Sequence, residues 1–200
     1  MSLPFTLPRR FPARRLMRVL AAGMAIALAG CGGSSTTTNI LLSGNIVGLT
    51  DAGLTLSNGI SSIVIGGGTT TFTFPNRTPL GAAYVVQPTT LPAAQVCTVT
   101  NGSGVAVKDV NTVLVTCVPS HTLGGTITGL SSGNLVMVNG GNVVSPVAGA
   151  QSFVFPGRVG QGFAYGVTVL NQPLQQNCTV INGVGTVGVS DINSIQVNCT

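Results

Sequence analysis

The chain contains the same segment twice, and this duplication limits the folds that it can adopt. Moving the sequence by 81 positions aligns the two copies without a gap as far as the Cys-Thr-Val segments, and one inserted residue then restores the match. The matched pairs include Gly44 with Gly125, Asn58-Gly59 with Asn139-Gly140, Phe72 with Phe153, Tyr84 with Tyr165, Cys97 with Cys178, Asp109 with Asp191, and Cys117 with Cys199. A repeat of this length favours two sequential modules, at residues 42–119 and 120–200. A single larger β-structure shared by both copies is the alternative.

Periodicity predicts that each module is all-β and folds as a small β-sandwich. β-branched runs interrupted by Asn-Gly and Gly-Gly pairs are typical of strands and hairpins, and Asn58-Gly59 lies between two alternating apolar runs. Phe72 and Phe74 fall on one face of their strand, which we expect to point inward. The expected strands of the first copy lie near residues 44–49, 53–57, 60–65, 70–74, 82–87, 95–100 and 111–118. Seven short strands of this spacing suggest a sandwich.

The N-terminal region has the order of a secretory signal. Five arginines without an acidic residue precede an apolar run from 19 to 29, which is too short to span a bilayer. The segment Leu28-Ala29-Gly30-Cys31 then resembles the lipobox of bacterial lipoproteins. A buried helix with an incidental cysteine is the alternative.

The resemblance to lipoproteins implies how the chain is processed and where it is held. Residues 1–30 would be a cleaved lipoprotein signal peptide, Cys31 would carry lipid with acyl chains such as palmitate, and residues 31–41 would form a flexible tether. In Gram-negative lipoproteins an aspartate after the lipidated cysteine marks retention at the inner membrane, whereas Gly32 follows here. The resemblance therefore implies lipid anchoring in the outer membrane, facing the periplasm or the cell exterior.

The charge of the chain belongs mostly to its N-terminal region. The whole sequence has a formal net charge of +5, but only Arg77, Lys108 and Arg158 follow Cys31, against Asp51, Asp109 and Asp191. The part after Cys31 is therefore formally neutral. Nucleic-acid binding needs several basic side chains to neutralise phosphates, so we expect no nucleic-acid partner.

Four cysteines remain after Cys31, and they allow three pairings. Their equivalent places in the two copies favour disulfides between Cys97 and Cys117 and between Cys178 and Cys199, which an exported protein can form. A zinc site or a redox pair would need close Cys-x-x-Cys spacing or accompanying histidines, and His121 is the only histidine in the sequence. We therefore expect no metal site and no cofactor.

No motif carries convincing catalytic chemistry. Gly183-Val-Gly185-Thr-Val-Gly188 matches the dinucleotide-binding pattern, but poor helix formers follow it and the first copy breaks the pattern. A catalytic triad could be imagined from Ser120, His121 and Asp109, yet no nucleophile elbow or oxyanion motif accompanies them. We predict that His121 is a linker residue and that the protein is not an enzyme.

The second copy carries a further pattern, Tyr165-Gly-Val-Thr-Val-Leu-Asn-Gln172-Pro173 followed by Cys178-Thr-Val-Ile-Asn-Gly-Val-Gly185. It resembles tandem immunoglobulin-like repeats of proteobacterial envelope proteins, although the first copy has Leu91 in place of the glutamine. The resemblance implies Ig-like modules and no particular activity. We expect a structural, adhesive or protein-interaction role with an unknown envelope protein or glycan as partner. The alternative is a module that binds carbohydrate or a small ligand, for which Phe72, Phe74 and Tyr84 would have to be exposed.

Overall fold

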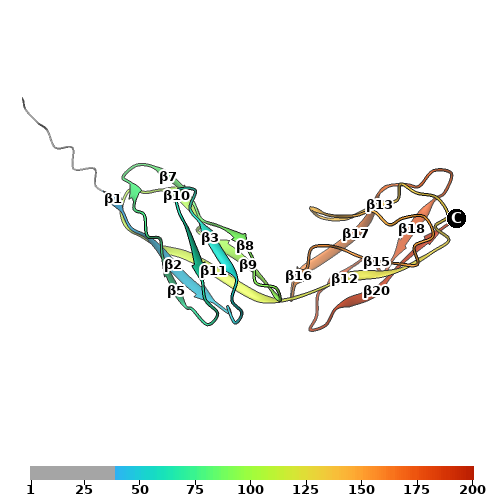
Figure 1. Ribbon diagram of the computed structural model, residues 1–200, viewed down its shortest axis with the longest axis horizontal. Helices are drawn as coiled ribbons and strands as arrows, with labels where there is room; N and C mark the ends of the chain where they lie inside the picture. Colours follow the sequence, from blue (N-terminus) through green and yellow to red (C-terminus); the bar gives the residue numbers. More distant parts are fainter. Residues whose placement is uncertain (1–38) are drawn as a thin grey trace, which may run out of the picture. The chain divides into compact units, whose positions relative to one another are not determined.

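The computed structural model describes residues 39–200, which form two β-sandwich modules with one hydrophobic core each (Figure 1). The signal peptide and the lipidated Cys31 expected from the sequence lie outside the described residues. Residues 39–200 contain strands and turns without any helix, so the fold class is all-β, as predicted. Among these residues, therefore, no helix has the length and hydrophobicity that crossing a bilayer requires.

The first module consists of two main sheets and two short strand pairs. One sheet has the order β9 (Gln95–Thr100), β11 (Val110–His121), β2 (Leu42–Val47), β5 (Thr71–Thr73), and the other has the order β4 (Ser62–Ile65), β3 (Leu54–Ser57), β8 (Gln87–Thr90). The short pairs are β1 (Asn39–Ile40) with β6 (Thr78–Pro79), and β7 (Ala83–Val85) with β10 (Ser103–Val105). The first and last long strands, β2 and β11, are parallel neighbours, whereas the other pairs are antiparallel.

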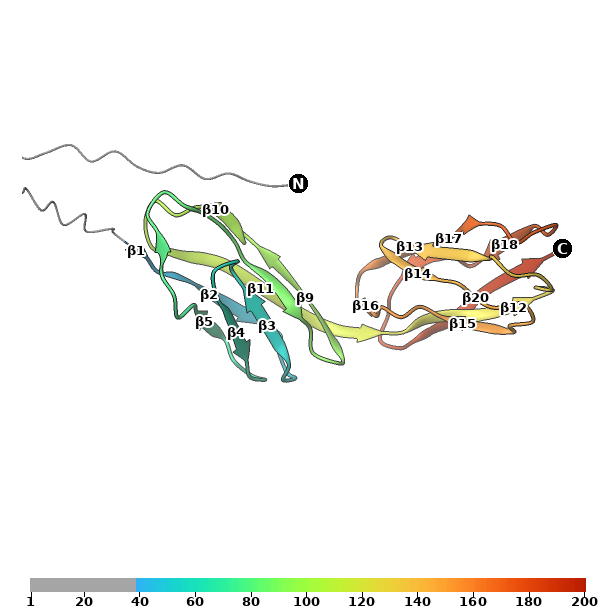
Figure 2. The ribbon, with the colours of Figure 1, turned by 45° about the horizontal axis from the view of Figure 1, so that its top comes forward.

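The second module repeats this plan (Figure 2). One sheet has the order β15 (Ser152–Val154), β12 (Leu123–Thr128), β20 (Ile192–Cys199), β18 (Cys178–Ile181). The other has the order β14 (Asn142–Val144), β13 (Val136–Asn139), β17 (Ala164–Asn171), β19 (Val184–Thr186). Its first and last long strands, β12 and β20, are again parallel. The repeat thus extends from the sequence to the strand pairing.

Alternation along the strands builds the two cores. In β2 and β3 every second side chain is buried, and Phe72 and Phe74 meet edge to face with ring centroids 5.7 Å apart. Phe153 and Phe155 repeat this contact at 5.8 Å. The inward orientation expected for Phe72 and Phe74 is confirmed, since they are 5% and 1% exposed. Aromatic pairs in this geometry add packing energy beyond their buried area.

Two differences from the expected strands concern the ends of the modules. Asn39 and Ile40 form β1 rather than part of the tether, because they pair with Pro79 and Thr78 and Ile40 is buried. Strand β11 continues through the expected boundary at 119/120, and its last two residues pair with β16 (Val159–Gly160) of the second copy. The two modules are therefore joined by a paired strand.

The Asn-Gly signals have different outcomes. Asn58-Gly59 lies in a hairpin, as predicted, but Ser57 pairs with Ser62, so the loop has four residues. The side chain of Asn58 is buried in this loop and accepts hydrogen bonds from the amides of Ile60 and Ser61. Asn101-Gly102 follows β9 without forming a hairpin, since β9 pairs with β11 and β10 pairs with β7. There the left-handed Asn101, with φ of 55°, directs the chain from β9 to β10, which forms a short pair with β7.

Candidate functional site

Each copy begins with the same polar arrangement, which we call the start cluster. In the first copy it consists of Asn39, Leu41, Arg77 and Asp109, and in the second copy of Ser120, Thr122, Arg158 and Asp191. The arginine precedes β6 or β16, and the aspartate precedes the last strand of its sheet. These loops bring one arginine and one aspartate to the segment where the chain enters each module.

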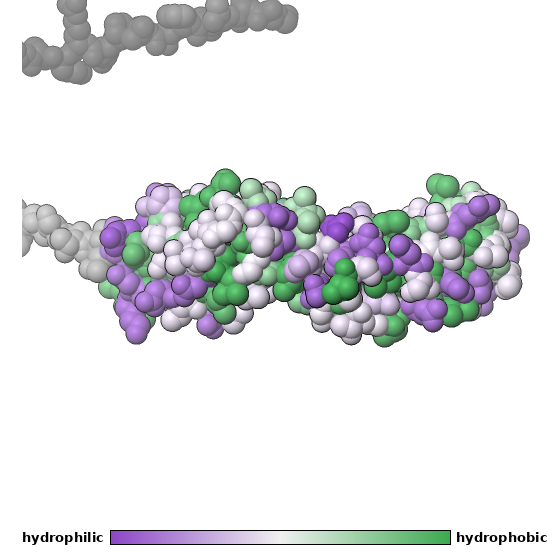
Figure 3. All heavy atoms as spheres, turned by 90° about the horizontal axis from the view of Figure 1, so that it is seen from below, coloured by the Kyte–Doolittle hydropathy of each residue, from purple (hydrophilic) through white to green (hydrophobic). Residues whose placement is uncertain are grey.

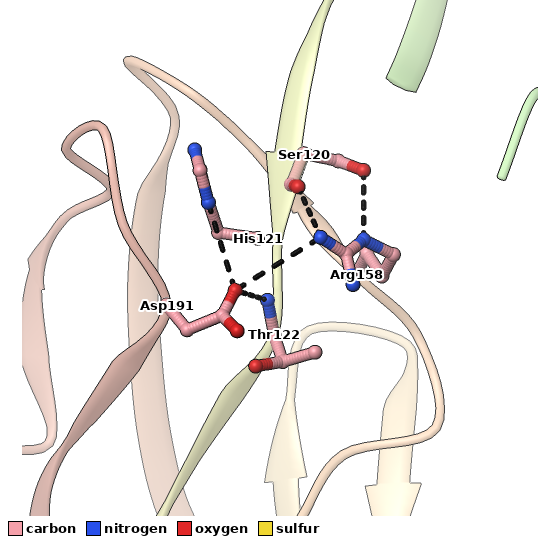
Figure 4. A network of polar contacts seen from close by, with 5 residues as sticks. All are labelled: Ser120, His121, Thr122, Arg158 and Asp191. Atoms are coloured by element: carbon pink, nitrogen blue, oxygen red, sulfur yellow. Dashed lines mark hydrogen bonds and ion pairs between the residues drawn. The ribbon is translucent and has the colours of Figure 1, made fainter. Parts of the chain in front are cut away.

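The second start cluster is the more elaborate of the two (Figure 4). Arg158 donates from Nε to Ser120 Oγ at 3.0 Å and from a terminal nitrogen to the Ser120 backbone carbonyl. Asp191 Oδ1 accepts a hydrogen bond of 2.8 Å from the backbone amide of Thr122. The same oxygen lies 3.6 Å from His121 Nδ1 and 3.9 Å from Arg158.

The first start cluster has the same backbone contacts with simpler side chains. Asp109 Oδ1 accepts from the backbone amide of Leu41 at 2.7 Å, and Arg77 donates to the Asn39 carbonyl at 3.3 Å. The position of His121 is occupied by Ile40, which is buried. Both clusters therefore hold the first residues of a module to loops far away in the sequence, and this shared function is structural.

The electrostatics of the second cluster centre on Asp191. The hydrogen bond from the backbone of Thr122 lowers the pKa of Asp191 below its usual value of 3.8, and a bond from the Thr122 side chain acts in the same direction. The nearby Arg158 and His121 lower this pKa further. The charged carboxylate is thus the form that the cluster stabilises.

The triad considered for His121 is not assembled. Ser120 Oγ accepts from Arg158, and the aspartate beside His121 is Asp191. Asp109 instead binds Leu41 at the start of the first module. The His121 side chain is only 16% exposed, and its buried Nε2 atom has no hydrogen-bond partner among residues 39–200. His121 therefore packs into the start of the second module, in the place of Ile40.

One glutamine holds the first loop of each sandwich, buried as Gln95 in the first copy and half-buried as Gln176 in the second, and it was missed by the sequence analysis. The side-chain oxygen of Gln95 accepts from the amides of Thr50 and Asp51 at 2.9 and 3.0 Å, and its nitrogen donates to the Gly48 carbonyl at 2.7 Å. Gln176 makes the same three bonds to Ser131, Ser132 and Gly129 at 2.9, 3.0 and 2.7 Å. The shift of 81 positions aligns the two glutamines, so the repeat itself contained the signal.

The second copy also uses the glutamine that Leu91 replaces in the first. Gln172 accepts from the Cys178 amide at 2.7 Å and donates to the Cys178 carbonyl at 3.0 Å. These two bonds hold the loop before β18 against the start of that strand. The glutamine of the repeat pattern is therefore a structural residue in this copy.

The structure contains both expected disulfides. Cys97 and Cys117 lie opposite each other on β9 and β11, and Cys178 and Cys199 lie opposite each other on β18 and β20. Their Cα atoms are 4.0 Å apart in both pairs. Among residues 39–200 no group of three or more His, Cys, Asp or Glu side chains could hold a metal ion.

The glycine pattern and the aromatic residues noted in the sequence belong to strands and to the core. Gly183 and Gly185 of the dinucleotide-like pattern flank the start of β19, a strand, whereas nucleotide binding would need a helix there. Tyr84 is 8% exposed, so it is buried with Phe72 and Phe74 and offers no stacking platform.

Two hollows lie on the surface of the first module. One of 260 Å³ is lined by Asn45 and Thr71, and the other, of 380 Å³, is lined by Val105 and Lys108. On the face shown in Figure 3, hydrophobic residues are interspersed with hydrophilic and neutral ones.

Comparison with known proteins gives fold-level likeness alone. No protein-family model matches the chain, and no characterised protein matches its sequence. Among solved structures, the shaft pilin SpaA from Lactobacillus rhamnosus GG is 14% identical, with a TM-score of 0.29 over 82% of this chain and 98% of the pilin. A double-mutant form of the same pilin gives the same values, and a single-mutant form is 13% identical with a TM-score of 0.25. At these values the likeness carries no inference about function.

Proposed function

We propose that this protein is a non-catalytic, lipid-anchored structural element of the cell envelope that carries tension between the membrane and a partner. The observation that carries the proposal is the parallel pairing of the first and last long strands in both modules. Tension applied at the two ends of such a module acts along β2 and β11 in opposite directions. The hydrogen bonds between the two strands are then loaded together in shear, instead of being opened one at a time.

The register of these strands supports a shared load. In the first module Val113, Leu114, Val115 and Thr116 pair in sequence with residues 44–47. In the second module residues 195–198 pair in the same way with residues 125–128. Val113 and Val115 are fully buried, so water has little access to the centre of the ladder. Forced unfolding is governed by the unfolding rate, which a protected shear ladder lowers.

The connection between the modules supports the same role. Strand β11 pairs with β2 and β9 along most of its length, and its last residues, Ser120 and His121, pair with Gly160 and Val159 of the second copy. Arg158 and Asp191 then hold Ser120 and Thr122. Force that leaves the first module along β11 therefore enters the second module through Ser120–Thr122, a segment that is hydrogen-bonded both to β16 and to the side chains of Arg158 and Asp191.

The anchor in this proposal is the lipid expected on Cys31, and the membrane is the outer membrane. The Leu28-Ala29-Gly30-Cys31 segment and the basic and apolar residues before it support this assignment. Seven residues separate Cys31 from Asn39, so the tether can reach at most about 25–30 Å. The partner at the other end would be an envelope protein. Phe72, Phe74 and Tyr84, which would have to be exposed for the carbohydrate-binding alternative, are buried, and Phe163 is the only exposed aromatic side chain among residues 39–200.

Single-molecule force spectroscopy on the full chain tests the tension-bearing role. With handles at the two ends, we expect two unfolding events of similar force, one for each module. A control molecule held at its N-terminus and at a clickable residue replacing Asn76 loads β2 and β5 from the end where Ser43 faces Thr73. That pair should open progressively, at a several-fold lower force. Equal forces in the two geometries would contradict the proposal.

A further inference from the structure

The end of the first module at which the chain arrives from Cys31 carries an exposed apolar tip. Leu80 follows β6 directly, and β6 pairs with the first described residues. Val105 ends β10 and Val107 lies in the loop that follows, and this segment is held to the Leu80 loop by the hydrogen bond from the Gly81 amide to the Ala106 carbonyl at 2.8 Å. The tip residues Leu80, Val105 and Val107 are 52%, 55% and 68% exposed.

A positive side chain borders this tip. Lys108 is exposed and immediately precedes Asp109, whose carboxylate is occupied by the Leu41 amide. A hollow of 380 Å³ beside the tip is lined by Val105, Val107 and Lys108, with Tyr84 at its inner side. Exposed aliphatic side chains next to a lysine match the boundary between acyl chains and headgroups of a bilayer.

The second copy provides an internal comparison, because two of the aliphatic positions are polar there, while Val184 and Val189 are 79% and 80% exposed. Gln161 replaces Leu80, Thr186 replaces Val105, and the loop equivalent to Lys108 contains Val189 and Ser190 without a charge. Val105 and Thr186 end equivalent strands and face equivalent partners, Ala83 and Ala164. The backbone is thus repeated, whereas the lysine is absent from the second copy and its exposed aliphatic side chains lie at other positions.

We infer that Leu80, Val105, Val107 and Lys108 form a contact surface for the lipid bilayer on which the protein is anchored. This inference rests on the lipid anchor of the proposed function. A tether of at most about 25–30 Å ends at Asn39 and keeps this end of the module within reach of the bilayer. The tip is too small to bind a bilayer stably by itself, but the lipid anchor holds it at a high effective concentration next to the bilayer surface. The second copy, which starts at the far end of β11, lacks the lysine and has Gln161 and Thr186 in place of Leu80 and Val105, although Val184 and Val189 are exposed there.

Tryptophan fluorescence with brominated lipid tests the inference. The sequence contains no tryptophan, so Val105→Trp introduces a single reporter at the tip, and Thr186→Trp places a matched reporter in the second copy. Both proteins are purified with their lipid and reconstituted in phosphatidylcholine vesicles whose acyl chains are brominated. We expect strong quenching at position 105 and none at position 186. Leu80→Ser in the Val105→Trp protein should reduce the quenching, as the tip loses affinity for the bilayer.

Other outcomes separate the inference from the proposal beneath it. The intact mass of each preparation shows whether acyl chains are present, and their absence would overturn the anchor itself. An acylated protein with equal quenching at both positions would overturn the inferred bilayer contact of the tip, while the lipid anchor on Cys31 would still hold. A blue-shifted Val105→Trp emission without quenching would show that a second copy of the chain covers the tip, which also overturns the inference.

Discussion

Gln95 and Gly48 are joined by a 2.7 Å hydrogen bond from the glutamine side chain to the glycine carbonyl, and their counterparts Gln176 and Gly129 are joined at the same distance. Each glutamine also binds two consecutive amides of the following loop. One buried or half-buried side chain therefore satisfies three backbone groups in a loop that lacks regular structure. This is the clearest case in which the duplicated sequence repeats a polar contact atom for atom.

Replacing Gln95 with leucine should destabilise the first module by at least about 2 kcal/mol, because three backbone groups lose their partners in a buried place. Gln176→Leu should have a smaller effect on the second module, since Gln176 is more exposed and water can replace its bonds. Amide hydrogen exchange at Thr50 and Asp51, and at Ser131 and Ser132, measures each change locally. Equal effects in the two modules would contradict this explanation.

Gly129→Ala should be much more damaging than Gly140→Ala, although both glycines have positive φ angles of 79° and 57°. A Cβ atom at Gly129 would collide with the Cys199 carbonyl oxygen, whereas one at Gly140 meets nothing within 4 Å. We expect about 1 kcal/mol for Gly140→Ala from backbone strain alone and on the order of 3 kcal/mol or more for Gly129→Ala. Denaturant unfolding of the two variants provides the comparison, and similar losses would show that the close approach at Gly129 is unimportant.

The stability of the second module should fall in acid because of Asp191. Its pKa in the folded protein lies below the usual 3.8, so the charged carboxylate stabilises the folded state above that pH. This contribution is lost as the pH falls from about 4 through the folded pKa. Asp191→Asn keeps an oxygen for the Thr122 amide and should remove this part of the pH dependence. Denaturant unfolding of the original protein and of Asp191→Asn at neutral pH and at pH 3 tests this prediction. An equal loss of unfolding free energy in acid for the two proteins would refute the role of Asp191.

Removing one disulfide should weaken the module that contains it. Cys97→Ala with Cys117→Ala opens a bridge between residues 20 positions apart, and loops of this length correspond to about 3 kcal/mol of stabilisation. The matched double variant at Cys178 and Cys199 should lose a similar amount in the second module. Hydrogen exchange assigns each loss to its module. Losses spread equally over both modules would indicate that the two cores unfold together.

The sequence predicted the features that are repeated or periodic. The alternating apolar residues placed β2, β3 and β9 within one or two residues, and the equivalent cysteines favoured the pairings that the structure contains. The short strands β1 and β6 were missed because two-residue bridges have no periodicity. The parallel pairing of β2 with β11 joins segments nearly seventy residues apart, so it cannot be predicted from the local sequence pattern of either strand.

The start clusters were partly visible in the sequence. Arg77 and Arg158 are two of only three basic residues after Cys31, and the repeat shift aligns them, as it aligns Asp109 with Asp191 once the inserted residue is counted. What the sequence could not show is that these side chains bind backbone groups about 40 and 70 residues earlier. His121 was expected in a linker, but strand β11 continues through it and leaves its side chain only 16% exposed.

Intact mass spectrometry of the protein taken from native membranes, before and after reduction, tests the account most directly. We expect a chain that begins at Cys31, carries acyl chains and gains about four protons when its two disulfides are reduced. Such a mass would give the module ends the membrane attachment that a tension-bearing role requires. A chain without acyl groups would contradict the account, because no fixed point would then exist against which β2 and β11 could be loaded.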